Sequence, residues 1–235
     1  VFNGQEHSSN EAANTSHTQQ PTVATAYKLS DDKETLLKWL DTATTTLDLS
    51  THPTLKRITI VGKEAFKGTP IVSITLPNTV EKIDQKAFEG CTSLTTVILP
   101  KNANFRTIAL STFEGCKSLT RIDIPDSVKE IEKFAFADAG LTEVKLPKEL
   151  FEIKEQAFAG NPQLKSITLP KTISHISTGA FMQTGLQTVT LNGTEPPRLS
   201  FPKGEAALQR KGAPFPFETL VDIIVPREAT NAYRV

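Results

Sequence analysis

The sequence is poor in the residues on which many catalytic sites and small folds depend. Its 235 residues include only 2 cysteines, 4 histidines, 2 tyrosines, 1 tryptophan and 1 methionine. Two cysteines cannot frame a disulfide-stabilised scaffold, and no run of 18 apolar residues is present to span a bilayer. The N-terminus has no charged region followed by an apolar one, so we expect either a cytosolic protein or one whose signal has been removed.

The sequence has no excess of positive or negative charge, because 26 basic residues balance 26 acidic ones. Without a surplus of lysine and arginine, a nucleic-acid partner is not expected. His7 and His17 lie in a polar tail, while His52 and His175 are far apart in the chain. No zinc, nucleophile or phosphate-loop motif is present. We therefore expect no enzyme activity, no metal and no cofactor.

Phenylalanine is the exception, with 13 residues, of which six recur at one position of a repeat. The dipeptide Ala-Phe marks this position at Ala65-Phe66, Ala87-Phe88, Ala135-Phe136, Ala157-Phe158 and Ala180-Phe181, with Thr112-Phe113 as a variant. A second marker in the same register falls at Leu76-Pro77, Leu99-Pro100, Ile124-Pro125, Leu146-Pro147 and Leu169-Pro170. Two markers in one register, with a period of 22 to 25 residues, indicate a repeat architecture.

Each copy has the pattern of a short strand followed by a return of the chain. Leu94, Val97 and Leu99 place apolar side chains at strand spacing, and the proline that follows ends the strand because it cannot donate to a ladder. Two apolar residues three apart, such as Val80 and Ile83, then fit a tight helical turn or an extended bend. Stacked copies bury the apolar edge that a single copy leaves exposed. The sequence predicts a solenoid with a parallel β-sheet on one face, short turns or helical turns on the other, about seven rungs and a cap at each end.

These features resemble a known family. The strand pattern and its period fall within the range of leucine-rich repeats. The Leu-Pro and Ala-Phe markers and the segment Gly90–Leu94 resemble the BspA-type leucine-rich repeats of bacterial cell-surface proteins. The resemblance covers residues 44–192, and Asp222–Pro226 is similar to the terminal cap of such arrays. It implies a leucine-rich repeat solenoid at the cell surface or secreted, with a role in adhesion or host-protein binding and no common catalytic motif.

The N-terminal segments differ from the repeats. Residues 1–27 are dominated by Ser, Thr, Asn, Gln and Ala, which predicts a flexible polar spacer. Residues 28–43 are expected to form an N-terminal cap helix, with Ser30 as its N-cap and Trp39 sealing its joint with the first repeat. The apolar residues that would share one helical face are Leu36, Leu37 and Leu40.

The C-terminal segment 193–235 is expected to form the second cap. The phenylalanines expected to replace the missing Ala-Phe contacts there are Phe201, Phe215 and Phe217. The first repeat has two alignments. Its strand is either Leu47–Leu49, with Ser50–Arg57 as an insertion, or Leu55–Ile60. The sequence alone leaves both open.

The exposed face of the repeat sheet offers a candidate binding site. The variable strand positions place Arg121 beside Glu143 and Asp123 beside Lys145 on neighbouring rungs. One interpretation is structural, with cross-strand ion pairs that avoid like-charge repulsion and contribute little to stability. The other is a recognition patch beside the longer loop Lys101–Arg106. The residues assigned to that patch are Arg121, Asp123, Glu143, Lys145, Ile98, Thr96 and Thr168.

Cys91 and Cys116 occupy the same position of successive rungs. Equivalent positions on neighbouring rungs lie about 5 Å apart, a separation that a disulfide allows. The alternative is a pair of buried thiols that act as small apolar side chains. We favour the thiols, because stacked side chains point in parallel rather than toward each other.

The function expected from these features is a non-enzymatic surface interaction module. It would bind an extracellular or host protein through the exposed face of the repeat sheet. Two alternatives are a structural or spacer element of the cell surface and a carbohydrate-binding accessory protein, although that face lacks the exposed aromatics of a sugar site. A membrane is expected to be a partner only through an N-terminal anchor outside this chain.

Overall fold

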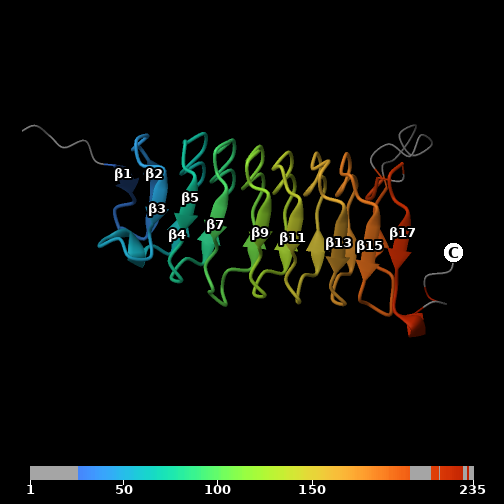
Figure 1. Ribbon diagram of the computed structural model, residues 1–235. Helices are drawn as coiled ribbons and strands as arrows, with labels where there is room; N and C mark the ends of the chain where they lie inside the picture. Colours follow the sequence, from blue (N-terminus) through green and yellow to red (C-terminus); the bar gives the residue numbers. More distant parts are fainter. Residues whose placement is uncertain (1–25, 202–212, 217, 230–231, 233–235) are drawn as a thin grey trace, which may run out of the picture.

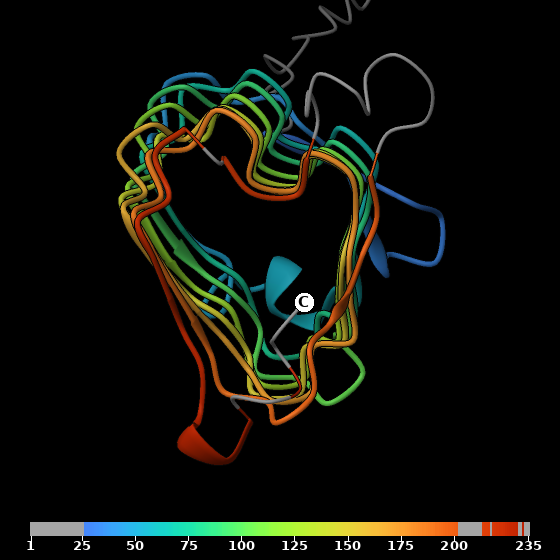
Figure 2. The ribbon, with the colours of Figure 1, turned by 90° about the vertical axis from the view of Figure 1, so that its right-hand side faces the viewer.

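The structure is a computed structural model that describes residues 26–201, 213–216, 218–229 and 232. The predicted polar spacer lies almost wholly outside these residues. The described chain coils through about seven turns of a solenoid (Figure 1), and successive turns superpose in a view along its axis (Figure 2). The predicted solenoid is confirmed. Its helices are the short 3-10 segments η1 (Leu55–Arg57) and η2 (Arg227–Ala229), and no helix in the described part is long and apolar enough to cross a membrane.

The first side of each turn is the strand of the repeat, and these strands form parallel ladders, here called the first wall. Its strands are β3 (Thr46–Asp48), β5 (Ser73–Thr75), β7 (Thr96–Ile98), β9 (Arg121–Asp123), β11 (Glu143–Lys145), β13 (Ser166–Leu169), β15 (Thr188–Leu191) and β17 (Asp222–Ile224). β3 pairs with β5 so that Leu47 lies opposite Ile74, and both side chains are buried. The alignment with Leu47–Leu49 as the first strand is therefore confirmed, and the rival is wrong because Leu55 lies in η1.

The return of each turn is extended and forms a second set of parallel ladders, here called the second wall. Its strands are β2 (Thr35–Trp39), β4 (Ile60–Val61), β6 (Lys82–Ile83), β8 (Thr107–Ile108), β10 (Glu130–Ile131), β12 (Glu152–Ile153), β14 (His175–Ile176) and β16 (Arg198–Leu199). The helical-turn alternative is wrong here. Extended backbone prevails because it lets the main chain of each turn bond to its neighbours, as Ile131 pairs with Ile153, whereas isolated helical turns would leave those groups unpaired.

The third side of each turn carries the Ala-Phe dipeptide, and its phenylalanines form one continuous stack through the core. The stacked rings lie 5.0 to 5.4 Å apart with interplanar angles of 2 to 9°. They belong to Phe66, Phe88, Phe113, Phe136, Phe158, Phe181 and Phe215. The Phe66 N–H donates to the Ala87 carbonyl of the next turn at 2.8 Å, and equivalent bonds recur along the stack. Trp39 seals the N-terminal end as expected, with its ring 5.9 Å from that of Phe66.

The N-terminal cap is a β-hairpin, and the cap helix expected over residues 28–43 is wrong. β1 (Tyr27–Leu29) pairs antiparallel with β2, and β2 pairs in parallel with β4. Leu36 is buried, whereas Leu37 and Leu40 are 46% and 44% exposed, so the three leucines do not share a face. Ser30 lies in the hairpin turn rather than at a helix N-cap. A strand prevails because it gives β4 a main-chain partner and covers the edge of the second wall.

The C-terminal segment continues both walls and the aromatic stack. β16 extends the second wall and β17 extends the first. Phe215 replaces the missing Ala-Phe contact, because its ring lies 5.3 Å from that of Phe181 and the Phe181 N–H donates to the Pro214 carbonyl. The same expectation is wrong for Phe201, which is 51% exposed in an irregular segment, and Phe217 lies outside the described residues.

The longest repeat interrupts both walls. Its first-wall strand β7 pairs with the preceding β5, whereas its second-wall strand β8 pairs with the following β10. The described ladders therefore stop between β7 and β9 and between β6 and β8. The inserted loop Lys101–Arg106 is held to the preceding turn, because the Lys101 N–H donates to Asn78 Oδ1 at 2.8 Å and Asn104 Nδ2 donates to Glu81 Oε1 at 3.0 Å. The first wall is interrupted once more, between β11 and β13.

Candidate functional site

Four charged side chains lie on the outer face of the two-stranded segment β9–β11. The register places Arg121 opposite Glu143 and Asp123 opposite Lys145, as the sequence predicts. All four are exposed, because neighbours along a strand face opposite sides and the intervening residue points toward the core. These four residues are here called the charged ridge.

Arg121 is at the centre of the ion pairs on the charged ridge. Its Nη1 lies 3.3 Å from Glu143 Oε2, and its Nε lies 3.5 Å from Asp123 Oδ1. Lys145 has no carboxylate within 4.0 Å in the part of the chain that the structure describes. The paired side chains are about 60% exposed, so water screens their attraction and the pairs contribute little to folding. The charges thus remain available to a partner.

A groove lies on each side of the charged ridge, where the first wall is interrupted. The groove between β7 and β9 has a volume of about 810 Å³, and the groove between β11 and β13 has a volume of about 440 Å³. On the strands that border the interruptions, Val97 and Val144 are half-buried, whereas Ile122 and Ile167 are buried.

All seven residues of the predicted patch line one groove or the other. Those in the first groove are Thr96, Ile98, Arg121, Asp123 and Lys145. Those in the second groove are Glu143, Lys145 and Thr168. The inserted loop contributes Lys101, Asn102 and Ala103 to the first groove. The structure brings the predicted residues together, and their role in binding stays a prediction.

The first groove combines apolar surface with charges of both signs. Ile98 is 51% exposed beside it. Asp126, on its far side, accepts a hydrogen bond from the Lys148 N–H at 3.1 Å. That bond, together with the nearby charges of Lys148 and Lys145, lowers the pKa of the Asp126 carboxyl. The groove is therefore lined by carboxylate and ammonium groups, a pattern that suits a partner with both charges.

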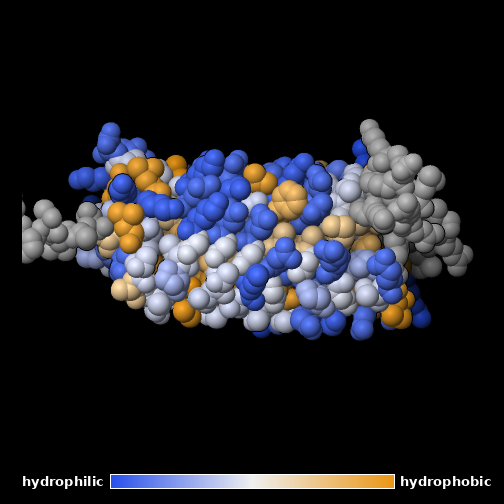
Figure 3. Space-filling model, turned by 90° about the horizontal axis from the view of Figure 1, so that it is seen from above, coloured by the Kyte–Doolittle hydropathy of each residue, from blue (hydrophilic) through white to orange (hydrophobic). Residues whose placement is uncertain are grey.

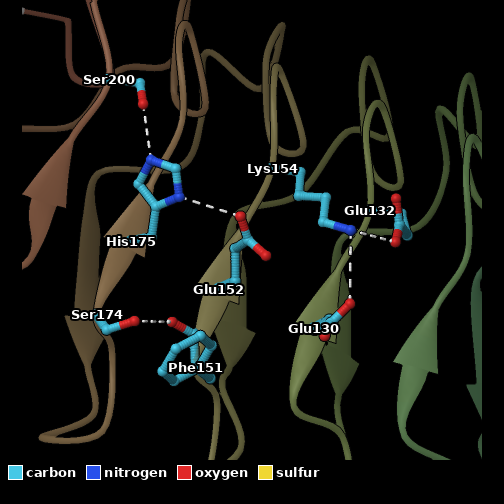
Figure 4. Close-up of polar contacts among 8 residues, drawn as sticks. All are labelled: Glu130, Glu132, Phe151, Glu152, Lys154, Ser174, His175 and Ser200. Atoms are coloured by element: carbon cyan, nitrogen blue, oxygen red, sulfur yellow. Dashed lines mark hydrogen bonds and ion pairs between the residues drawn. The ribbon is translucent and has the colours of Figure 1, made fainter.

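Sequence reasoning missed a second polar cluster, on the second wall. His175 Nδ1 lies 3.1 Å from Glu152 Oε1, and its Nε2 lies 2.7 Å from Ser200 Oγ (Figure 4). The two hydrogen bonds are those of a serine–histidine–acid triad. Ser200 is half-buried, and it is not among the residues that line the adjoining groove. An alignment of the second-wall strands would have placed Glu152 beside His175 on neighbouring turns.

Cys91 and Cys116 are buried free thiols in the structure, and the disulfide alternative is not formed. Cys91 Sγ donates to the Phe66 carbonyl at 3.0 Å, and Cys116 Sγ donates to the Phe88 carbonyl at 3.1 Å. Burial raises the pKa of both thiols. Each thiol therefore stays protonated at neutral pH and satisfies a carbonyl of the preceding turn.

The remaining described surface supplies little chemistry of other kinds. No group of three or more histidine, cysteine, aspartate or glutamate side chains is placed to hold a metal ion among the described residues. The face in Figure 3 is covered mainly by hydrophilic and neutral side chains, with hydrophobic atoms in small separate patches.

Comparison with known proteins agrees with this architecture. Residues 102–195 match the model of the BspA type leucine rich repeat region, in 6 copies. No curated protein matches the chain.

Solved structures of bacterial leucine-rich repeat proteins share the fold. A leucine-rich repeat protein of T. pallidum is 27% identical, with a TM-score of 0.65, and the match covers 88% of this chain and 92% of that one. One from Bacteroides ovatus is 22% identical, with a TM-score of 0.59 and coverage of 75% and 51%. One from Eubacterium ventriosum is 23% identical, with a TM-score of 0.52 and coverage of 67% and 48%.

Proposed function

Because the repeat region of this chain belongs to the BspA-type leucine-rich repeat family, we propose that the protein is a non-enzymatic interaction module that binds an extracellular or host protein. Proteins of this family are typically found at the cell surface, and their fold typically binds rather than catalyses. The proposed site is the charged ridge with its two grooves. The proposed location is the cell surface or the extracellular medium.

The observation that carries the proposal is the coincidence of the charged ridge with the two interruptions of the first wall. On the continuous ladders through β5 and β15, the outer face of these two strands carries small hydroxyl side chains. At the charged ridge, exposed charges of both signs stand between two hollows, one of which has the exposed Ile98 at its side. The two grooves, the charges of both signs and the exposed Ile98 together favour the surface of a folded protein as the partner.

The two alternatives make different demands on this surface. In a spacer, the charged ridge would serve only to form cross-strand ion pairs. Exposed ion pairs of this kind add little to stability. A sugar-binding site on the first wall would call for an aromatic platform, and no aromatic side chain lines either groove in the described part. The protein-binding function therefore accounts for more of what the first wall presents.

The test is binding of the purified chain to a panel of host extracellular-matrix and plasma proteins. The test variant changes Arg121, Asp123, Glu143 and Lys145 together to Ser. We expect at least one panel protein to bind the parent and to lose about tenfold or more in affinity for the variant, because opposite charges across an interface set its specificity.

A matched control removes two ion pairs that lie outside the charged ridge, by changing Lys82, Asp84, Lys133 and Glu155 to Ser. It deletes the same number of charges of each sign, so it should bind like the parent. Equal loss in both variants, or no binder in the panel, would argue for the spacer instead.

A further inference from the structure

The second wall carries an exposed aromatic side chain in a setting unlike any on the first wall. Phe151 directly precedes β12 and is 53% exposed. Its N–H donates to the Lys129 carbonyl of the preceding turn at 2.8 Å, and its carbonyl accepts the Ser174 N–H of the next turn at 2.9 Å. The main chain is thus fixed on both sides while the ring stays in solvent, so the ring is not needed to fill the core.

A groove of about 740 Å³ adjoins this ring. It runs across β12, β14 and β16, and the hydroxyl of Ser174 donates to the main-chain carbonyl of Phe151 at 3.3 Å (Figure 4). Its lining includes three residues that carry or can carry positive charge, which are Lys171, His175 and Arg198. The lining also includes Glu152 and Glu195, so the groove combines a flat apolar face with basic and acidic groups.

The acidic side chains nearby already have partners. Lys154 Nζ lies 2.6 Å from Glu132 Oε1 and 3.5 Å from Glu130 Oε2, and hydrogen bonding to Glu132 raises the pKa of Lys154. Glu152 is engaged by His175 at 3.1 Å (Figure 4). Glu130 and Glu132 share one lysine and Glu152 bonds to a histidine, so the wall keeps acidic groups beside its basic ones.

Basic side chains along the same wall have no such partners. None of them has a carboxylate within 4.0 Å in the described part of the chain. They are Arg106, Lys129, Lys171 and Arg198. Arg106 and Lys129 precede β8 and β10 just as Phe151 precedes β12, and Arg198 pairs with His175 in the ladder. Basic groups and the aromatic ring therefore follow one another along the solenoid axis, at the strand spacing of about 4.8 Å.

We propose that this second-wall groove binds an acidic polysaccharide that carries carboxylates on part of its sugar rings. The apolar face of a sugar packs on the ring of Phe151, and its carboxylates pair with Lys129, Lys171 and Arg198, since guanidinium and ammonium groups bind carboxylates well. A linear polymer matches the linear array of sites. Nucleic acid fits less well, because a charge at every nucleotide would meet Glu130, Glu152 and Glu195 as well.

The probe is a hyaluronan decasaccharide, which alternates neutral and carboxylated sugars, titrated into the full chain by calorimetry at low salt. Phe151→Ser and the double variant Lys129→Ser/Arg198→Ser should each weaken binding by about tenfold, and added salt should weaken it further. The control Lys56→Ser/Lys117→Ser removes the same charge from exposed lysines away from this groove and should bind like the parent.

Three results would overturn the proposal. They are no binding tighter than about 1 mM, equal affinity for a neutral dextran oligosaccharide, or equal affinity for single-stranded oligo-dT of the same length. Because the site lies on the other wall, the charged-ridge variant should retain hyaluronan binding. If hyaluronan does not bind, the proposed protein-binding function of the charged ridge is not affected. If no panel protein binds the charged ridge, the polysaccharide site on the second wall is not affected.

Discussion

At the scale of single residues, the core is held by identical side chains stacked on one another. Neighbouring phenylalanine rings within the stack have their centroids 5.0 to 5.4 Å apart. The alanine beside it is small enough for adjacent backbones to share hydrogen bonds. Where Thr112 replaces alanine, its buried hydroxyl donates to the Ala109 carbonyl at 2.8 Å, so the polar atom is satisfied.

Phe136 tests this stack, because it lies near the middle of the array and is fully buried. We expect Phe136→Ala to lower the free energy of unfolding by about 3–5 kcal/mol, since it leaves a cavity between two rings. Phe201→Ala is the matched control: its ring is 51% exposed, and the change should stay within about 0.5 kcal/mol. Urea denaturation followed by circular dichroism measures both. Equal effects would contradict the assignment of Phe136 to the stack.

Residue identities in the core were predictable because each is repeated. The Ala-Phe and Leu-Pro markers assigned the buried positions of every regular turn, and the same register placed Arg121 opposite Glu143. Phe151 was not predictable in this way. Its equivalents along the chain include Lys129 and Ser174, so nothing in the repeat pattern marks its position as special.

At the scale of elements, the turns are joined by main-chain ladders on more than one side. Most two-residue strands of the second wall bury one residue, as Glu130 and Ile131 show, and are too short for an alternating pattern. The sequence pattern is therefore equally compatible with an extended bend or a helical turn. The prediction of a helical N-terminal cap is wrong for a related reason. A short apolar run at helical spacing is also compatible with a strand, and here that strand pairs with the edge of the neighbouring sheet.

Two neighbouring leucines distinguish the hairpin from a helix. In the strand β2, Leu36 is buried and Leu37 is 46% exposed, whereas a helical cap would bury both. We expect Leu36→Ser to cost about 2–5 kcal/mol and Leu37→Ser to change stability by less than about 0.5 kcal/mol. Thermal and urea unfolding of the two variants provide the comparison. A large loss of unfolding free energy for Leu37→Ser would contradict the hairpin and favour the helical cap.

At the scale of the whole molecule, the candidate site arises from an irregularity in the array. In the longest repeat, which ends in Ile124 and is two residues longer than the repeat before it, β7 pairs with the preceding strand β5 and β8 pairs with the following strand β10. The first wall is therefore interrupted beside β9. The sequence showed the extra length and the charges beside it. It could not show the grooves, because the separation of neighbouring strands depends on how successive turns twist and stack rather than on any one residue.

The central claim is that the charged ridge is a recognition surface rather than a set of cross-strand ion pairs. The most direct test inverts the whole ridge, with Arg121→Glu, Asp123→Lys, Glu143→Arg and Lys145→Asp in one variant. Inversion keeps every pairing of opposite charges within and between β9 and β11, so the melting temperature should stay within about 2 °C of the parent.

The measurement is the affinity of this variant for the panel protein that binds the parent most tightly. The account predicts a loss of about tenfold or more, because each charge then faces a like charge on the partner. Unchanged affinity in the folded, inverted variant would contradict it and would leave the ridge with a purely structural role.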